Sequence, residues 1–278
     1  SNNSHLFSHT FFLAGIPGLS ATHIWISVPF CFMLHQPMFL FLSMLCFMNV
    51  VLSLSTVLKM LAIFWVGSTA ISSHDCLSQM FVIHSFSAIE SGVLVPMALD
   101  CFVAICNPLH YTTILTPVVV TKIRGLVVLR GVGLTIFFPS LAHQLAYCGS
   151  HTVAYTYCEH MAIVKLACGT TTVDSLYAFA MANFLGVGDM AFVAYSSGHI
   201  VKTVMCLPSP KARAKAGSTC TAHVCVILFF YGSGFLSVVM ECFGPHTASG
   251  AKVILTNLYL LLPPALNTIV YGVKTKKI

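Results

Sequence analysis

The chain has 278 residues, of which 57% are apolar and only 7% are charged, and its formal net charge is +6. Ordinary globular domains carry roughly 25% charged residues, so this chain has too few charges to cover a water-facing surface. The composition therefore excludes a soluble domain and indicates a membrane protein with the lipid bilayer as its solvent.

Apolar runs long enough to cross a bilayer recur along the chain. A helix needs about 20 predominantly apolar residues to span the hydrocarbon. Six runs reach that length: 39–66, 77–106, 123–145, 176–205, 217–241 and 253–273. No repeat, linker or low-complexity tract separates them in the sequence. We therefore predict one all-α membrane domain over residues 1–278, with six full spans.

A shorter apolar segment precedes these runs. Residues 23–34 supply only about a dozen suitable positions for a span of about 20, and Pro37 soon afterwards is typical of the first turn of a helix. Segments of this length are more often interfacial, re-entrant or signal-peptide cores than full spans. No Lys or Arg precedes the segment, and this disfavours a signal peptide.

Basic residues are concentrated in alternate segments between the spans. The segments 107–130, 202–216 and 274–278 hold ten, and the other connecting segments hold only Lys165 and Lys252. The ten are Lys122, Arg124, Arg130, Lys202, Lys211, Arg213, Lys215, Lys274, Lys276 and Lys277.

This bias gives the orientation, because cytoplasmic loops carry an excess of Lys and Arg. We predict a cytoplasmic C-terminus and exterior loops at 67–76, 144–175 and 242–252. The bias also accounts for the net positive charge, so the charge gives no separate reason to expect a nucleic-acid partner.

Four of the twelve cysteines lie in the predicted exterior loops: Cys76, Cys148, Cys158 and Cys168. The exterior is oxidising, so pairing is expected there. A metal site at Cys158, Glu159 and His160 is the less favoured alternative, because the chain has no CxxC pair with zinc-like spacing. We predict neither a metal nor a cofactor.

The run MALDCFVAICNP at 97–108 places a carboxylate, Asp100, at the end of a hydrophobic span, where an ionisable group is costly and usually functional. The run resembles the signature M-A-(F/L)-D-R-(F/Y)-V-A-I-C-x-P at the end of the third helix of odorant receptors. Further motifs occur in that family's order: FLAGIPGL at 12–19, HQPMFLFL at 35–42, KAGSTCTAH at 215–223 and LPPALNTIVY at 262–271. The chain is similar in these motifs to class I (fish-like) odorant receptors of the rhodopsin-like family.

The resemblance implies a seven-transmembrane receptor bundle in the plasma membrane, with an extracellular N-terminus. It implies a small odorant as ligand and a heterotrimeric G protein of the olfactory stimulatory type, which raises cAMP, as partner. It also implies disulfides Cys76–Cys158 and Cys148–Cys168. Asn2, in the pattern Asn2-Asn3-Ser4, matches the family's N-terminal glycosylation site.

The resemblance also suggests which residues contact the ligand: His84, Ser87, Met161, Tyr231, Val238 and Cys242. His84 matches the family's pocket histidine, although an ordinary histidine satisfied by a neighbouring backbone group is an equal alternative. Cys242 stands where the family has the Arg that binds carboxylate odorants, and a thiol lacks the bidentate donor that a carboxylate needs. We therefore expect neutral, apolar odorants rather than acids.

The G-protein switch implied by the resemblance comprises Asp100, Cys101, Ser197, Asn267 and Tyr271. Cys101 replaces the family's Arg and Ser197 replaces its Tyr. Thr268 replaces a helix-kinking Pro, and Asn49 stands in place of a buried Asp. Compared with the family, about twenty residues are missing between Met33 and Leu34, which shortens the first helix below the length of a span. We expect impaired coupling.

Two further carboxylates, Glu90 and Asp189, lie inside predicted spans. Such groups are functional candidates by default, but pairing with a bundle-facing Ser, Asn or His is the favoured interpretation. Pro96 inside the span 77–106 removes a helical hydrogen bond, which typically costs ~3 kcal/mol.

The sequence bears on three other functional classes. An enzyme is not supported, because the sequence has neither a nucleophile elbow nor a phosphate loop. A transporter would show inverted repeats or paired broken helices, and neither is evident in the sequence. A non-signalling remnant of a receptor stays open as the alternative to a working odorant receptor.

Overall fold

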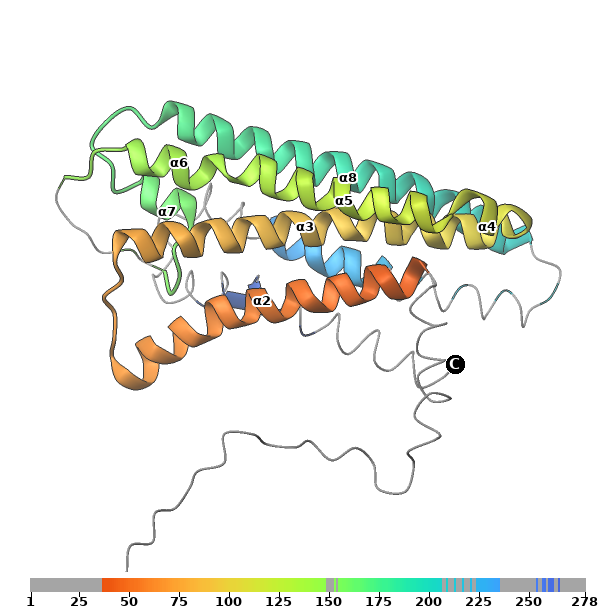
Figure 1. Cartoon of the computed structure of the whole chain (residues 1–278), viewed down its shortest axis with the longest axis horizontal. Coiled ribbons are helices and arrows are strands. Elements are labelled where there is room, and N and C mark those ends of the chain that lie inside the picture. Colours follow the sequence, from red (N-terminus) through yellow and green to blue (C-terminus); the bar gives the residue numbers. More distant parts are fainter. Residues whose placement is uncertain are drawn as a thin grey trace, which may run out of the picture.

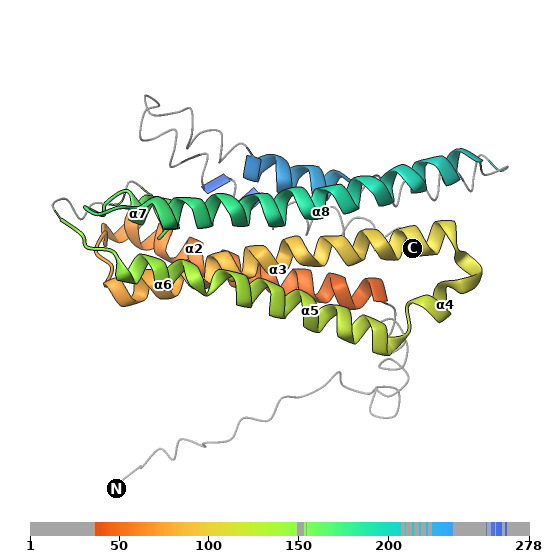
Figure 2. The same ribbon diagram turned by 90° about the horizontal axis from the view of Figure 1, so that it is seen from above.

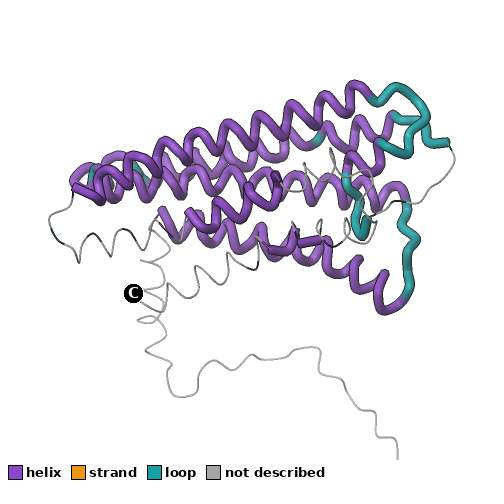
Figure 3. Tube along the Cα trace, turned by 180° about the vertical axis from the view of Figure 1, so that it is seen from behind, coloured by secondary structure: helices purple, strands orange, loops and turns teal. Residues whose placement is uncertain are grey.

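The computed structural model describes residues 37–148, 155–206 and 224–235, with further positions at 153, 209, 213, 217, 221, 254, 257–258, 260–262 and 265. Several predicted features lie outside the described residues: segment 23–34, Asn2, Val238, Cys242, Asn267, Thr268 and Tyr271. The described part is almost entirely helical, as Figure 3 shows, and no strand is found in it.

Four of its helices are long and apolar enough to cross a membrane (Figure 1). They are α2 (Pro37–Val66), α3 (Ser73–Cys106), α5 (Pro117–Thr135) with its continuation α6 (Phe137–Gln144), and α8 (Thr172–Cys206). The predicted spans 39–66, 77–106, 123–145 and 176–205 are thereby confirmed. Val224–Phe235 is an apolar helix inside the predicted span 217–241, and the described positions between 254 and 265 are also helical.

The helices begin two to six residues before the apolar runs, and polar residues cap two of them, α3 and α5. Ser72 precedes α3, and its hydroxyl accepts a hydrogen bond from the amide of Asp75. Thr116 does the same for the amide of Val119 at the start of α5, where Pro117 occupies the first turn. Such caps satisfy amides that have no partner within the helix. Hydropathy alone detects the apolar run and misses the capped turn.

Helix α3 is the centre of the bundle. It contacts α2, α5 and α8, and Figure 2 shows it between α8 and α5. The approach of α5 depends on glycine, because a Cβ at Gly131 would lie 2.4 Å from a side-chain carbon of Ile89, and one at Gly92 would lie 2.9 Å from Val127. Small residues at these two points allow the close backbone contact on which helix association in lipid depends.

Pro96 lies buried inside α3, which nevertheless continues to Cys106. Prolines are tolerated in membrane helices because neighbouring helices and local adjustments satisfy the freed backbone groups. The predicted oddity is therefore accommodated without ending the helix.

The outer faces of α2 and α8 carry large exposed apolar side chains. On α2, Phe47, Val50, Leu54 and Leu58 are each more than half exposed and follow the i, i+3, i+7 spacing of a single helical face. Exposed apolar surface of this extent would be unstable in water and fits a lipid-facing position.

The short elements lie at the two ends of the bundle (Figure 1). The 3₁₀ turn η1 (Pro108–His110) and α4 (Tyr111–Ile114) follow α3 at one end, and α7 (His160–Val164) lies between α6 and α8 at the other. The predicted cytoplasmic and exterior loops are thus segregated to opposite ends.

Both predicted disulfides are present at the α7 end. The Cα atoms of Cys76 and Cys158 are 5.4 Å apart, and those of Cys148 and Cys168 are 5.7 Å apart. Both separations lie in the range that a disulfide bridges. Because Cys158 is bonded to Cys76, it has no thiolate with which to bind a metal at the alternative site 158–160.

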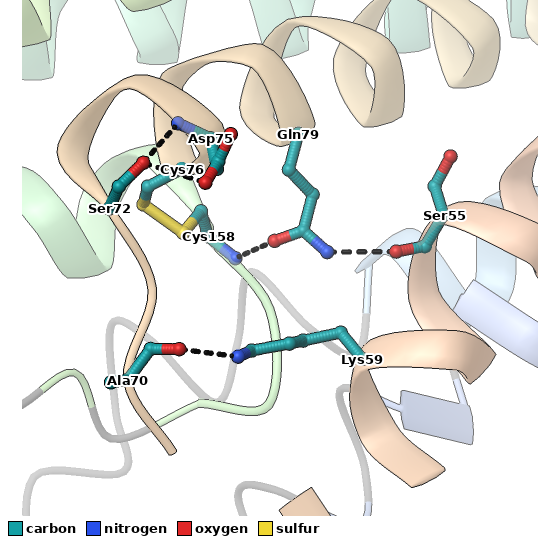
Figure 4. Close-up of a disulfide and its surroundings, with 8 residues drawn as sticks. All are labelled: Ser55, Lys59, Ala70, Ser72, Asp75, Cys76, Gln79 and Cys158. Atoms are coloured by element: carbon teal, nitrogen blue, oxygen red, sulfur yellow. Dashed lines mark hydrogen bonds between the residues drawn. A yellow bond between two sulfur atoms is a disulfide. The ribbon is translucent and has the colours of Figure 1, made fainter. Parts of the chain in front are cut away.

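Gln79 ties this end together around the first disulfide (Figure 4). Its amide nitrogen donates to the carbonyl of Ser55 on α2 at 2.8 Å, and its amide oxygen accepts from the backbone amide of Cys158 at 3.1 Å. Nearby, the ammonium of Lys59 leaves the apolar run and donates to the carbonyl of Ala70 in the following loop at 2.8 Å. The hydrocarbon stem of a lysine allows this escape from the membrane.

Candidate functional site

A charged pair lies in the middle of the bundle. The guanidinium of Arg130 on α5 donates through both terminal nitrogens to the carboxylate of Asp189 on α8, at 2.8 and 2.6 Å. The Asp189 side chain is 6% exposed. A bidentate pair of this kind is the strongest form of side-chain hydrogen bonding, and it offsets the desolvation of a carboxylate placed among membrane helices.

Two hydroxyl groups extend this pair to two more helices. Ser91 on α3 donates to the Asp189 carboxylate. The hydroxyl of Tyr231 lies 3.0 Å from that of Ser91 and donates to the carboxylate at 3.4 Å. We call these four residues, Arg130, Asp189, Ser91 and Tyr231, the central polar network. It joins α3, α5, α8 and the helix Val224–Phe235.

The network corrects one prediction and confirms another. Asp189 does pair with a bundle-facing serine, Ser91, but its main partner is Arg130. Arg130 was placed in the predicted cytoplasmic segment 107–130. This assignment is wrong, because Arg130 lies well inside the span Pro117–Gln144. The sequence contained the signal, since an Arg inside one apolar run and an Asp inside another are expected to pair.

Three of the predicted ligand contacts lie near one face of α3. Two of them, His84 and Ser87, are on α3 itself, and the third, Tyr231, bonds to Ser91 on the same face. His84, Ser87 and Ser91 are spaced i, i+3 and i+7, so they share a face of the helix. Ser91 bonds to Tyr231, and His84 lies almost two turns closer to the α7 end. The structure therefore brings His84 and Ser87 onto one face with Tyr231 beneath it.

The ring of the predicted pocket histidine begins a chain of two ring contacts. The ring of His84 stacks on Phe138 of α6 with a centroid separation of 4.7 Å. Phe138 in turn contacts the edge of His160 at 4.8 Å. The Nε2 atom of His84 is buried and has no hydrogen-bond partner among the described residues.

The α7 segment packs against α6 and α8 at this end of the bundle. Glu159 caps α7 by accepting a hydrogen bond from the amide of Ala162 at 2.7 Å, and burial raises the pKa of the Glu159 carboxyl. His160 is 1% exposed, its Nε2 lies 4.0 Å from the carboxylate of Asp174, and burial lowers its pKa to about 4. Met161, another predicted contact, follows His160 on α7 and is partly buried. Sequence reasoning missed His160 as a neighbour of His84 because the ring contacts cross three elements.

At the opposite end of α3, Asp100 has a neutral partner. The hydroxyl of Tyr111 on α4 donates to its carboxylate at 2.6 Å, and Asp100 is 4% exposed. Burial and this contact raise the pKa of the Tyr111 hydroxyl. Tyr111 was missed in the sequence because it follows a turn at Pro108 that returns the chain to α3.

Cys101 is directed into an apolar contact. It packs with Ile200 and Val204 of α8 in a small buried cluster. Ser197, the other described switch candidate, lies one turn before Ile200 on the same helix and is partly buried. The position that the family fills with Arg therefore holds a small hydrophobic contact between α3 and α8.

The geometry as a whole defines a multi-pass helical membrane protein of the receptor class. It has two disulfides at the α7 end, a polar network in the middle of the bundle, and a carboxylate at the other end of its central helix. The model of the olfactory receptor family matches residues 20–278. The chain belongs to the olfactory receptor family, whose members bind odorants and couple to G proteins.

Human olfactory receptors of the 52 and 51 groups are among the similar proteins. Olfactory receptor 52K2 of Homo sapiens is 46% identical, over 96% of this chain and 92% of the relative. Olfactory receptor 52K1 of Homo sapiens is 45% identical, over 100% of this chain and 95% of the relative. Olfactory receptor 51G2 of Homo sapiens is 42% identical, over 100% of this chain and 95% of the relative. The resemblance to class I odorant receptors is confirmed, and an enzymatic role does not fit this family.

The alignment lengths bear on the missing residues. The match to olfactory receptor 52K1 extends over 298 positions and takes in the whole chain, which has 278 residues. The difference, 298 − 278, is 20 positions at which the relative has a residue and this chain has none. This number agrees with the expected gap, and its placement between Met33 and Leu34 stays a prediction.

Proposed function

We propose that this chain is a plasma-membrane odorant receptor of one domain, residues 1–278, that binds neutral, apolar odorants between α3, α7 and the helix Val224–Phe235. In this proposal its C-terminus is cytoplasmic, and its N-terminus is extracellular and glycosylated at Asn2. His84, Ser87, Met161 and Tyr231 contact the odorant, together with Val238 and Cys242, which lie outside the described residues.

The observation that carries the proposal is the position of Tyr231. Its hydroxyl belongs to the central polar network, directly below the α3 face that bears His84 and Ser87. An odorant that displaces Tyr231 would change hydrogen bonds to α3 and α8 together. A ligand shifts a conformational equilibrium only by as much as it prefers one state, and these bonds supply such a difference.

We further propose that coupling to the stimulatory olfactory G protein is weakened in this chain. The switch would involve Asp100, Cys101, Ser197, Asn267 and Tyr271. Cys101 has neither the reach nor the five donors of a guanidinium, and its burial against Ile200 and Val204 supports a static contact at this position. The same contact favours the second candidate, a non-signalling remnant.

A cAMP assay normalised to surface expression tests the ligand site. A panel of neutral odorants is compared with carboxylic acids of matched chain length. We expect any response to favour the neutral series and to fall at least tenfold in potency in Ser87→Leu, which fills the proposed site. Ser140→Leu on α6 is the matched control, because Ser140 is exposed and bonds only to its own helix. A response confined to the acids would contradict the proposed ligand class.

A second series tests the coupling defect. The natural chain is compared with Cys101→Arg, with Cys101→Ser as the control that removes the thiol without adding a guanidinium. We expect a small or absent response in the natural chain and in Cys101→Ser. Restoration of a full first helix with Cys101→Arg and Thr268→Pro should recover part of it. A full response from the natural chain would contradict impaired coupling, and no response from the restored chain would favour the remnant.

A further inference from the structure

A groove of about 810 Å³ lies between α2 and α5. Its lining is mostly apolar, with Met44, Phe47 and Met48 from α2 and Val128, Leu129 and Val132 from α5. None of the four proposed odorant contacts that the structure describes, His84, Ser87, Met161 and Tyr231, lines it. The groove is therefore a separate feature, on the side of the bundle where α2 and α5 flank α3.

One end of the groove is polar. Ser43 on α2, with Thr121 and Arg124 on α5, lines it near the first residues of both helices. In the orientation proposed above, this end faces the cytoplasm, because both helices start there. The groove thus changes from polar to apolar along the direction from the cytoplasmic surface towards the membrane centre.

The depth of Arg124 matches that of a lipid headgroup. The span Pro117–Gln144 has 28 residues, which is about 42 Å of helix at ~1.5 Å per residue, against a hydrocarbon thickness of about 30 Å. About 6 Å therefore projects at each end. Arg124 lies about 10 Å from the start of the helix, so its Cα is about 4 Å inside the hydrocarbon, a distance that an arginine side chain covers.

One donor of the Arg124 guanidinium has no acceptor among the described residues. This donor is the Nε atom, which is buried. The described residues form two ion pairs, Arg130–Asp189 and His160–Asp174. Neither pair involves Arg124. A buried donor without an acceptor is costly, and an anionic oxygen would remove that cost.

We propose that the groove binds one anionic phospholipid of the cytoplasmic leaflet. Its phosphate would lie against Arg124 with Thr121 and Ser43 beside it, and an acyl chain would extend along Met44, Phe47 and Val128. Basic pockets between membrane helices on the cytoplasmic side are suited to anionic headgroups. A second copy of the chain would cover the apolar part but would leave the guanidinium without an anion.

The test is lipid retention by the full-length receptor. The purified protein is reconstituted in nanodiscs of equimolar phosphatidylcholine and phosphatidylserine with identical acyl chains, and retained lipids are counted by native mass spectrometry. We expect one phosphatidylserine per receptor, retained at least fivefold more often than phosphatidylcholine. Equal retention of the two lipids would overturn the proposal.

Two variants with matched controls locate the site. Arg124→Gln should reduce phosphatidylserine retention at least fivefold, whereas Lys122→Gln should leave it unchanged, because Lys122 lies about 200° around the same helix and outside the groove. Gly125→Leu should reduce retention with Arg124 still present, because its side chain would fill the groove. Gly133→Leu is the control, since a Cβ at either glycine meets no atom within 4 Å and only Gly125 lines the groove.

A crosslinking measurement keeps the test decisive if a variant is unstable. Phosphatidylserine with a photoreactive acyl chain is added to membranes that contain the natural chain, and labelled peptides are mapped. We expect labels on the segments 44–48 and 128–132. Labels confined to other helices, an equal loss in Lys122→Gln, or a dimer that Gly125→Leu abolishes would each overturn the proposal. None of these outcomes depends on odorant response, so failure here is distinct from failure of the receptor proposal.

Discussion

The α7 end and the middle of the bundle differ from its α4 end in how their polar groups are joined. The proposed orientation makes the α7 end the outer end and the α4 end the cytoplasmic end. The outer end has two disulfides and Gln79, which joins α2 to the loop at Cys158. The middle has the central polar network, which joins four helices. At the cytoplasmic end, Asp100 has one neutral partner, Tyr111, and Cys101 has an apolar contact.

This difference separates holding the bundle together from switching it. The disulfides hold the fold in one conformation, whereas the hydrogen bonds of the central polar network can change when a ligand displaces Tyr231. A switch needs a contact that differs in energy between two states, and the thiol of Cys101 lacks the five donors that a guanidinium would bring to such a contact. In the function proposed above, the outer and middle parts hold the receptor bundle together, and Cys101 in place of Arg weakens the switch at the cytoplasmic end.

Loss of the outer cross-links should have the largest effect on stability. The bond Cys76–Cys158 closes a separation of 82 residues and Cys148–Cys168 closes 20. In the chain-entropy model these are worth ~4 and ~3 kcal/mol respectively. We expect Cys76→Ser with Cys158→Ser to lower the thermal midpoint of the purified receptor more than Cys148→Ser with Cys168→Ser. Cys46→Ser is the control, because Cys46 is an exposed free thiol. The reverse ranking would contradict the entropic account.

The next largest effect should come from the central polar network. Arg130→Met leaves the buried carboxylate of Asp189 without its charged partner, a change that typically costs ~3 kcal/mol or more. The thermal midpoint and the fraction of receptor at the cell surface should both fall. Lys122→Met on the same helix is the control, since Lys122 is exposed. If the two variants were equally stable, the pair would contribute nothing to the fold.

These two features show what the sequence can and cannot predict. The disulfides followed from motif resemblance, and the four described spans followed from apolar runs, because both depend on local pattern. The pairing of Arg130 with Asp189 joins residues 59 apart in the chain. Each residue was visible as a polar group in an apolar run, but their contact depends on how α5 and α8 pack around α3.

The contacts of His84 and Asp100 were hidden for the same reason. His84 stacks on Phe138 because α6 continues α5 along α3, and no spacing in the sequence encodes this. Tyr111 reaches Asp100 because η1 and α4 return the chain towards α3. The sequence identified the chemically important residue in each case, and the fold supplied its partner.

The outer end should also depend on pH through His160. Burial lowers its folded-state pKa to about 4, below the ordinary value of about 6.5. Between these values the unfolded chain binds the proton and the folded receptor does not, so stability falls as pH falls. At pH 5 the loss relative to pH 7.5 is about 2 kcal/mol.

His160→Gln isolates this contribution from other groups. The raised pKa of Glu159 acts in the opposite direction, because a carboxyl that prefers its proton in the folded state gains stability as pH falls. The variant keeps Glu159 and Asp174, so the thermal midpoint should depend less on pH between 7.5 and 5 than that of the natural receptor. Parallel curves for the two proteins would show that His160 has no part in the pH dependence.

The smallest effect should come from the cytoplasmic end, where Tyr111→Phe removes the hydroxyl that donates to Asp100. Loss of a hydrogen bond to a buried carboxylate typically costs ~1–3 kcal/mol, and α4 is short enough to let water replace the donor, so we expect ~1 kcal/mol. The same substitution is then made together with Cys101→Arg. If the new guanidinium becomes a partner of Asp100, Tyr111→Phe should cost less in that background, and a double-mutant cycle of thermal midpoints measures the difference. Equal costs in both backgrounds would mean that Arg at position 101 does not reach Asp100, and that the switch cannot be restored at this position alone.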